Sequence, residues 1–380
     1  MSLSKELAVL VGNGLSVAFN ADLDLRRLTD EILTRLGREI SEPEERAMRD
    51  IANLALPQGA VTEDDFERFV GAFGEESRRL DLLCTLAQVT PSSDVELQDA
   101  IKLVSGYTKR IRDMAVSHVL EVIFERSRMG MGDATGIEST IRAITEQFNG
   151  KIVFGNLNYD TILLATLLRV CSSGSLADMG FGFGKSELDL GGDTQVSMRP
   201  LRMSRADFPT ENRVLLLHLH GSLTFWREPK GAMGKVLTDD LENESPWSRI
   251  REGATLARPV VILANQGEKS ALAQEDPFRL AYSMFAHSIA EKRNWLIIGY
   301  SFKDSEVNRV FRDAFLSLPE KPAVLVVTRA DMEATRRLVE SVFGWGREDG
   351  TSDGWLTIDS DGALGLEARD PWTTFLASAT

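Results

Sequence analysis

The sequence predicts an α/β protein with a mostly parallel sheet, helices on both faces of that sheet, and an inserted helical module. Short runs of Val, Ile and Leu recur along the 380 residues and alternate with segments whose apolar residues have helical spacing. Continuous apolar runs of this kind are typical of strands that are buried on both faces, as in a parallel sheet. We therefore expect one domain over residues 1–330, with an extension, 331–380, packed on the same domain.

The expected elements follow one another along the chain. Buried strands are expected within 6–16, 151–154, 213–221, 258–265, 294–301 and 322–328. Helices are expected at 23–37 and 304–318, and the block from about 62 to 130 reads as the inserted helical module. Residues 174–192 hold six glycines, so the region of about 172–212 is expected to be a Gly-rich loop. The end, 345–380, reads as loops and a short strand.

Composition excludes several classes of protein. The formal net charge is −14, with 57 acidic and 43 basic residues, so we expect no direct binding of DNA or RNA. No apolar run approaches the roughly 18–20 residues that span a bilayer, and the first residues do not resemble a secretory signal. Two cysteines provide neither a disulfide framework nor a four-cysteine zinc site. We expect a cytoplasmic protein without a metal.

Polar motifs end four of the expected strands. They are GNGLS at 12–16, GNLNYD at 155–160, HLHGS at 218–222 and GYSFKD at 299–304. Each alone fits ordinary turn chemistry; for example, Asp160 or Thr161 could cap the following helix. Ligands of parallel α/β sheets bind beyond the carboxyl ends of the strands, where these four motifs converge.

Two of the motifs allow a narrower interpretation. GNGLS suits either a tight strand–helix turn or a phosphate-binding turn. It is not a G-x-G-x-x-G fingerprint, because Val17 stands at the third glycine position, and this disfavours a hydride-transferring dehydrogenase. In HLHGS, His218 and His220 are expected on the same face of a strand. A metal pair would need a third ligand, which no nearby motif supplies. His220, next to the Gly221 turn, is the histidine placed to reach a ligand and accept a proton near neutral pH.

Together the four motifs resemble the sirtuin-like proteins, and most closely the bacterial sirtuin-like NADases of antiphage defence. The resemblance spans residues 9–310 and implies a Rossmann-like sheet that binds NAD⁺ as a substrate. It implies that Asn158 and His220 are the catalytic pair and that Asp160 supports the site. The cofactor-binding residues that it implies are Gly12, Asn13, Gly14, Ser16, Asn156, Gly221, Ser222, Gly299, Tyr300, Ser301 and Asn308.

The sequence departs from this family in three places. Asn156 replaces the usual threonine two residues before the catalytic asparagine. The segment AFNADLD at 18–24 stands where deacylating sirtuins carry Gly-Ile-Pro. The zinc ribbon of deacylating sirtuins cannot be built from two cysteines. These departures count against protein deacylation and leave the NAD-cleaving core in place.

The expected function is therefore that of an NAD⁺ glycohydrolase, which releases nicotinamide and ADP-ribose and depletes NAD⁺ in abortive infection. The alternatives are a non-catalytic module that binds NAD or ADP-ribose, and an NAD-dependent deacylase or ADP-ribosyltransferase. A defence effector must be silent at rest, so the resemblance also implies control by homo-oligomerisation or by a partner such as a HerA-type ATPase.

Overall fold

The computed structural model describes residues 5–38, 43–61, 65–66, 68–72, 82–86, 95–129, 134–180, 184–263 and 266–379. Its main sheet has seven strands in the order β12-β11-β10-β1-β2-β6-β3, and every neighbouring pair is parallel. The strands are β1 (Leu7–Val11), β2 (Ile152–Asn156), β3 (Leu176–Ala177), β6 (Val214–His218), β10 (Asn294–Ile298), β11 (Ala323–Val327) and β12 (Leu356–Asp359). The predicted parallel α/β fold is confirmed.

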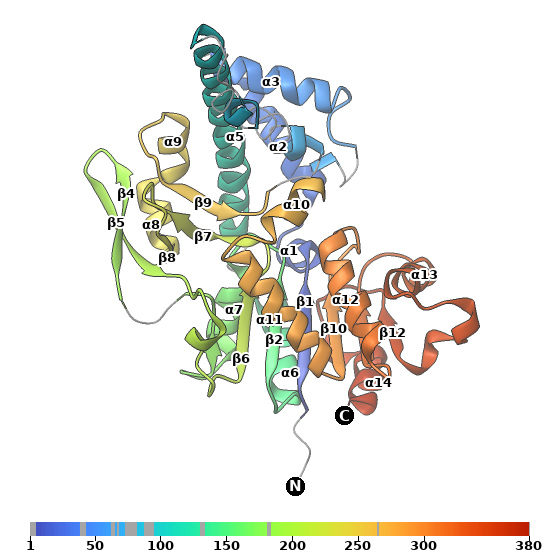
Figure 1. Ribbon diagram of the computed structural model, residues 1–380. Coiled ribbons are helices and arrows are strands. Elements are labelled where there is room, and N and C mark those ends of the chain that lie inside the picture. Colours follow the sequence, from blue (N-terminus) through green and yellow to red (C-terminus); the bar gives the residue numbers. More distant parts are fainter. Residues whose placement is uncertain are drawn as a thin grey trace.

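The central strand β1 is the point where the strand order reverses. It pairs with β2 on one side and with β10 on the other. The chain runs outward from β1 through β2 to one edge, then returns across the sheet to β10 (Figure 1). The carboxyl ends of strands at such a switch point form a crevice, which is where open α/β sheets bind ligands.

Alternate residues of β1 pack against opposite layers of helices. Leu7, Val9 and Val11 belong to one apolar core, whereas Ala8 and Leu10 belong to the other. The first core includes side chains of α6 (Thr135–Gln147), α7 (Ile162–Val170) and α14 (Asp370–Ser378). The second includes side chains of α11 (Phe278–Glu291), α12 (Ser305–Ser317) and α13 (Met332–Phe343). Both faces of the sheet are therefore covered, which explains its continuous apolar strands.

A second sheet, which the sequence analysis does not predict, lies beside the first. Its five strands are antiparallel and have the order β4-β5-β8-β7-β9. They are β4 (Ser186–Gly191), β5 (Thr194–Pro200), β7 (Gly221–Arg227), β8 (Met233–Val236) and β9 (Arg258–Val261), with helices α8 (Thr238–Glu244) and α9 (Pro246–Arg251) between the last two. Figure 1 shows the β4–β5 hairpin extending away from the main sheet.

This second sheet corrects three expectations. The region 172–212 is not a loop, because it contains β3, β4, β5 and a short 3-10 turn at Arg205–Asp207. The strand expected at 258–265 is β9 of the antiparallel sheet. The expected strand 213–221 ends at His218, and the chain enters the second sheet at Gly221. In β4 and β5 buried apolar residues alternate with exposed polar ones. In the sequence this alternation indicates a strand less strongly than the surrounding glycines indicate a loop.

The helical module stands at the carboxyl edge of the main sheet. It consists of α2 (Leu25–Arg38), α3 (Pro43–Ala55), the long α5 (Val95–Met129) and the described residues between α3 and α5. It is preceded by α1 (Asn13–Phe19) and the 3-10 turn Ala21–Leu23. Figure 1 shows α5 rising from the body, with α2 and α3 beside it. Part of the block expected at 62–130 lies outside the described residues. Within the described part of the chain, no helix is both long and apolar enough to cross a membrane.

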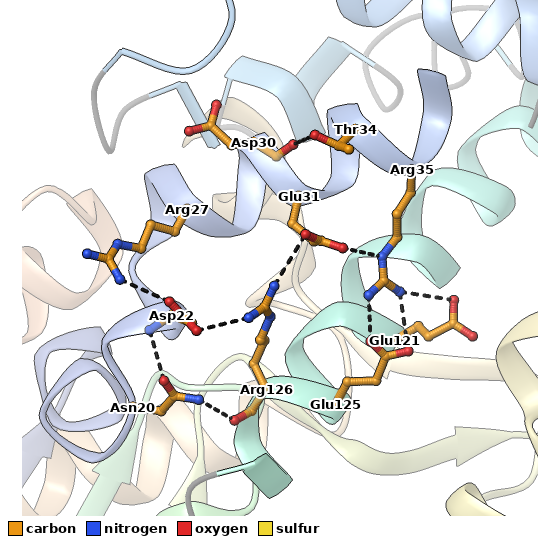
Figure 2. Close-up of polar contacts among 10 residues, drawn as sticks. All are labelled: Asn20, Asp22, Arg27, Asp30, Glu31, Thr34, Arg35, Glu121, Glu125 and Arg126. Carbon is orange, nitrogen blue, oxygen red and sulfur yellow. Dashed lines mark hydrogen bonds and ion pairs between the residues drawn. The ribbon is translucent and has the colours of Figure 1, made fainter. Parts of the chain in front are cut away.

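Charged side chains join α2 to the C-terminal half of α5 (Figure 2). Arg35 of α2 forms a two-pronged pair with Glu125, at 2.5 and 3.2 Å, and its Nε donates to Glu31. From α5, Arg126 reaches back to Asp22 and Glu31, at 2.9 and 3.2 Å. These pairs fix the base of α5 against the residues that follow α1.

The last part of the chain completes the main sheet at one edge. After α13, strand β12 pairs in parallel with β11, and α14 covers the face that α6 also contacts. Short 3-10 turns at Arg347–Asp349, Ser352–Gly354 and Leu366–Ala368 connect these elements. The region 345–380 therefore contains the expected short strand and, in addition, a helix.

Candidate active site

Glycines let two turns touch at the carboxyl ends of β1 and β10. The N–H groups of Gly12 and Gly14 donate to the carbonyl oxygens of Ile298 and Gly299, each across 2.9 Å. A Cβ atom on Gly14 would lie 2.5 Å from the Gly299 Cα, and one on Gly12 would lie 2.6 Å from the Gly299 oxygen. Gly299 has a φ of 62°, a conformation that favours glycine. Backbone contact by itself therefore requires these glycines, and their expected contacts with a phosphate stay a prediction.

The turn after β2 is held by its own amides. The Asn158 N–H donates to Asn156 Oδ1, and Asn156 Nδ2 donates to the Asn158 carbonyl oxygen, both at 3.2 Å. The Asn158 side chain donates through Nδ2 to the Gly12 carbonyl oxygen at 3.0 Å. That bond joins the turn after β2 to the turn after β1, and it uses the NH₂ group of the Asn158 amide. Within the described residues, no hydrogen bond is formed by its Oδ1.

Asp160 joins α7 to α1. One carboxylate oxygen accepts from the Ile162 N–H at 3.0 Å, and the other accepts from Ser16 Oγ at 2.5 Å. Thr161 makes no side-chain capping bond, so Asp160 satisfies the first N–H of α7. Burial raises the pKa of Asp160 above its usual 3.8, although the two hydrogen bonds oppose that shift.

His220 lies where the chain crosses from the main sheet to the second sheet. Its ring stacks on Tyr159, with centroids 6.4 Å apart and planes 29° from parallel. Its Nε2 is 3.1 Å from the Tyr282 hydroxyl and 3.2 Å from Asp304 Oδ2. The following Gly221 has a φ of 85°, and a Cβ there would lie 2.2 Å from a backbone oxygen of β9. The turn that positions His220 therefore requires a glycine.

His218 does not share the environment of His220, and the expectation that both face the same way is wrong. Strand β6 ends at His218, so the alternation of strand side chains does not continue to His220. The His218 ring packs edge-on against Phe225 and is fully buried. Burial lowers its pKa to about 4, against the opposing charge of Asp178. His218 is a neutral core histidine.

The turn after β10 has an internal hydrogen-bonded frame. The Tyr300 hydroxyl lies 2.8 Å from Asn308 Oδ1 and 3.0 Å from the Asp304 carbonyl oxygen. Asn308 Nδ2 donates to the Phe302 carbonyl oxygen at 2.7 Å. This bond supports Phe302, whose φ of 58° is unusual for a residue with a side chain. Asn308 thus shapes the loop from behind.

These turns surround a cavity of about 670 Å³. That volume is within the roughly 300–1,000 Å³ typical of small-molecule and cofactor sites. Apolar side chains of the helical module, including Phe66, Val70 and Ile123, form one end, and Thr328 and Arg329 after β11 form another part of the wall. The expected site residues on the wall are Gly12, Asn13, Gly14, Asn158, Asp160, His220, Gly299, Tyr300 and Ser301.

The other expected cofactor-binding residues lie behind the wall. Ser16, Asn156 and Asn308 bond the turns described above. Ser222 is fully buried and bonds Thr224, and Gly221 packs against β9. The structure therefore gives these five residues a role in shaping the cavity. In the described part of the chain, no group of three or more His, Cys, Asp or Glu side chains is arranged to hold a metal ion.

Three cavity residues escape the sequence analysis as functional residues: Tyr159, Lys269 and Asp304. So does Tyr282, which contacts His220 but does not line the cavity. Lys269 and Tyr282 come from α10 (Gln266–Leu272) and α11, whose residues no motif marks. Tyr159 stands inside the quoted GNLNYD motif, but no role is expected for it there. Asp304 stands inside the quoted GYSFKD motif, but an aspartate before a helix reads first as a cap. It is indeed the cap of α12, since its Oδ1 accepts from the N–H groups of Glu306 and Val307.

The charges around His220 are fixed by burial and by neighbouring groups. Burial would raise the pKa of Asp304, but the close contact with His220 and the charges of His220 and Lys269 lower it well below 3.8. Burial and the Asp304 charge raise the pKa of Tyr282 well above 10. At neutral pH His220 therefore faces an ionised carboxylate on the cavity wall and the neutral phenol of Tyr282, which does not line the cavity.

A family model for the SIR2-like domain matches residues 154–343, which is half of the chain. The chain belongs to the SIR2-like domain family. The match begins within β2 and covers the His220 turn and the β10 turn with α12 and α13. Strand β1 and the helical module precede it.

Other comparisons with this SIR2-like protein are less informative. No curated protein matches it. A solved structure described as "Structural Basis for the Mechanism and Regulation of Sir2 Enzymes" is similar, with 9% identity and a TM-score of 0.38. The similarity covers 99% of this chain and 92% of that one. The fold assignment rests on the strand order and not on this low score.

Proposed function

We propose that this SIR2-like protein is an NAD⁺ glycohydrolase that cleaves the bond between nicotinamide and ribose. The observation that carries the proposal is that Asn158 and His220, which come from different strand ends, line one cavity beside the β1 turn. Membership of the SIR2-like family supports NAD⁺ as the ligand. The resemblance of the four motifs to sirtuin-like NADases supports hydrolysis.

The proposed step uses water as the nucleophile. The water oxygen forms a bond to the anomeric carbon of the ribose, and the glycosidic C–N bond breaks. The bonding pair leaves with nicotinamide, which departs as a neutral molecule, so no strong general acid is needed. His220 accepts the proton that the water loses, and the second product is ADP-ribose. The transition state resembles an oxocarbenium ion, as in other glycoside hydrolyses.

The contacts of Asn158 suit a positioning role in this step. Its Nδ2 is anchored on the Gly12 carbonyl oxygen, which fixes the amide plane. Its Oδ1 can then accept a hydrogen bond from the attacking water or a ribose hydroxyl. Orientation of this kind is worth several kcal/mol of activation free energy, so the loss of Asn158 should slow turnover strongly.

The test is turnover by the full chain. We expect stoichiometric nicotinamide and ADP-ribose from NAD⁺, lost in Asn158→Ala and His220→Ala but kept in the control His287→Ala, which changes an exposed histidine paired with Glu291. Thermal unfolding would show that the variants are folded. Unchanged turnover in a folded Asn158→Ala or His220→Ala variant would contradict the proposal. Calorimetric binding of NAD⁺ without turnover would favour a binding module, and ADP-ribose attached to protein would favour a transferase.

We further propose that the activity is held in check until infection and depletes NAD⁺ in antiphage defence. The support is the resemblance of the motifs, together with a surface that suits an assembly. The helical module includes exposed apolar side chains: Leu54, Val61, Leu82, Leu83, Leu86, Val95, Leu97, Leu103 and Val104. Homo-oligomers and a partner ATPase are the candidate regulators. Sedimentation of the purified chain, alone and with a candidate ATPase, would distinguish them.

A further inference from the structure

Asp304 uses its two carboxylate oxygens for different purposes. Oδ1 accepts from the N–H groups of Glu306 and Val307, both at 3.0 Å, and so caps α12. Oδ2 lies 3.2 Å from His220 Nε2 and 3.7 Å from Lys269 Nζ. Both His220 and Asp304 are buried, at 6% and 5% exposure. A cap alone does not require the second oxygen to face a histidine inside a cavity.

The chemistry of the carboxylate determines which nitrogen of His220 carries a proton. An ionised carboxylate carries negative charge and no hydrogen, so a nitrogen lone pair 3.2 Å from Asp304 Oδ2 would be repelled, and the charge favours a hydrogen on the nitrogen that faces Asp304. In a neutral imidazole one nitrogen is a donor and the other carries a lone pair. If Nε2 carries the hydrogen, the lone pair is on Nδ1, which pairs with no group among the described residues. His220 itself lines the cavity.

The remaining neighbours of His220 are compatible with this arrangement. The Tyr282 hydroxyl, on α11, can accept from the same Nε2–H at 3.1 Å. Tyr159 stacks on the ring face and donates its own hydroxyl hydrogen to the Ile262 carbonyl oxygen at 2.7 Å. Lys269, on α10, faces Asp304 Oδ2. Among the described residues, the charged groups near the ring are thus Asp304 and Lys269. Asp304 Oδ2 is at ion-pair distance from Nε2 but forms no hydrogen bond with it, because the hydrogen bond of Nε2 is to the Tyr282 hydroxyl.

We propose that Asp304 is a positioning residue that holds His220 in the Nε2–H form, so that Nδ1 is the atom that accepts the proton from water. The role of Nδ1 as proton acceptor rests on the proposed hydrolysis. The orientation of the imidazole does not depend on it, and that orientation can be measured without a substrate. Asp304 also stabilises the imidazolium that forms when Nδ1 takes the proton, because a negative charge remains beside Nε2.

Asp304→Asn is the sharpest variant. Asparagine caps helices about as well as aspartate, so α12 keeps its cap. The new amide can turn its NH₂ group toward Nε2, which favours the opposite form of the imidazole, with the hydrogen on Nδ1. Asp331→Asn is the matched control, because Asp331 caps α13 by accepting from the Ala334 N–H at 2.8 Å.

The first measurement is long-range ¹H–¹⁵N NMR of the full chain with ¹⁵N-labelled histidine, at a pH where His220 is neutral. Loss of one signal in His220→Gln assigns the residue among four histidines. We expect Nε2–H in the wild-type protein and in Asp331→Asn, and a shift toward Nδ1–H in Asp304→Asn. An Nδ1–H signal in the wild-type protein, or no change in Asp304→Asn, would overturn the proposal.

The second measurement is the kinetics of NAD⁺ hydrolysis. Loss of a correctly oriented base costs about 10²–10⁴ in rate, so kcat of Asp304→Asn should fall at least about a hundredfold with KM changed less than about threefold. Asp331→Asn should keep wild-type kcat. A wild-type kcat in Asp304→Asn would overturn the proposal. If the NMR result is as expected but the wild-type protein does not hydrolyse NAD⁺, the orientation stands and the proposed function fails.

Discussion

Ser16 and Asp160 share a buried hydrogen bond of 2.5 Å, which connects α1 to the start of α7 across 144 residues of chain. The two residues belong to different motifs and different strand ends. Because Asp160 also accepts from the Ile162 N–H, the one carboxylate holds two turns of the cavity in register. The bond therefore helps to hold the turn that carries Asn158.

This bond predicts a pH-dependent effect of Asp160→Asn. The raised pKa of Asp160 means that the folded protein holds its proton more tightly than the unfolded chain does. The stabilisation from that proton is complete below the unfolded value of about 3.9 and is lost as the pH rises through the raised folded pKa. Asparagine carries no such charge. The free energy of unfolding of Asp160→Asn, minus that of the wild-type protein, should therefore increase from pH 4 to pH 7.

Urea unfolding at the two pH values measures the effect. Ser16→Ala is the companion variant, and it should cost about 2 kcal/mol at pH 7 because it removes a hydrogen bond to a buried carboxylate. An unfolding free energy of Asp160→Asn that moves in parallel with the wild-type value from pH 4 to pH 7 would contradict the argument.

The contact between Gly14 and Gly299 predicts opposite results for one substitution at two positions. Gly14→Ala should destabilise the protein by several kcal/mol, because its Cβ would meet the Gly299 Cα at 2.5 Å and backbone must move. Gly106→Ala, in α5, should stabilise it by about 0.5–1 kcal/mol, since no atom lies within 4 Å of the added carbon and alanine favours the helix. Thermal unfolding of both variants tests this. Equal shifts in the unfolding temperatures of Gly14→Ala and Gly106→Ala would show that the contact between Gly14 and Gly299 is not rigid.

The charged cluster in Figure 2 predicts a salt-dependent contribution to stability. Arg35 contacts three carboxylates and is only 25% exposed, whereas Arg27 is 52% exposed and pairs with Asp22 alone among the described residues. Arg35→Ala should cost about 1–2 kcal/mol at low salt and less at 0.5 M NaCl, and Arg27→Ala should cost less than about 0.5 kcal/mol at either. Urea unfolding at both salt concentrations checks the ranking. A cost for Arg35→Ala that does not change with salt would point to lost packing.

Two buried histidines predict acid sensitivity. Burial lowers the pKa of His118 to about 3, helped by the charges of Arg251 and Arg35, and burial lowers that of His218 to about 4. The unfolded chain binds protons at both sites below about pH 6.5, and the folded protein does not. The stabilisation is therefore complete above pH 6.5 and falls as the pH drops toward 4.

The two sites together should give the unfolding free energy a slope of about 2.7 kcal/mol per pH unit between about pH 4.5 and 6. His118→Leu should reduce that slope by about half. His287→Ala, which changes an exposed histidine, serves as the control. Urea unfolding at a series of pH values supplies the slopes, and an unchanged slope in His118→Leu would refute the assignment of His118 as neutral.

The contact of Tyr282 with His220 predicts that Tyr282→Phe reduces the proposed activity less than Asp304→Asn does. The Tyr282 hydroxyl is one of two oxygen neighbours of His220 Nε2, and the other, Asp304, carries the charge. Tyr282→Phe should lower kcat by less than about tenfold, because the negative charge of Asp304 still faces Nε2. Steady-state kinetics beside Asp304→Asn and the exposed control Tyr107→Phe test this order. A larger loss in Tyr282→Phe than in Asp304→Asn would make the phenol the dominant partner.

The main sheet was predictable because its strands carry a strong local signal. β1, β2, β10 and β11 are nearly continuous apolar runs, and each lies within or next to its predicted range. The second sheet was not predictable from the same criteria. Its β4 and β5 are stabilised by pairing with each other and with β8, which is information that a local apolar pattern does not contain.

The candidate site was predictable where a motif ends a strand, as at Asn158 and His220. It was not predictable where a helix brings a side chain from far along the chain. Tyr282 lies 62 residues beyond His220, within an ordinary amphipathic helix. Local patterns also did not reveal that His218 and His220 lie in different environments. The cause is that the chain leaves the main sheet after His218 and enters the second sheet at Gly221.

The pairing of β1 with β10 also sets the order of events during synthesis. Residues 12–293 separate the two strands, so at 5–20 residues per second a ribosome needs roughly a quarter of a minute to one minute between them. Until β10 emerges, Gly12 and Gly14 lack the surface that Gly299 provides, and His220 lacks Asp304. A chain that ends before Gly299 therefore cannot carry the assembled cavity, and whatever chemistry the cavity performs begins only after Gly299 and Asp304 have been made.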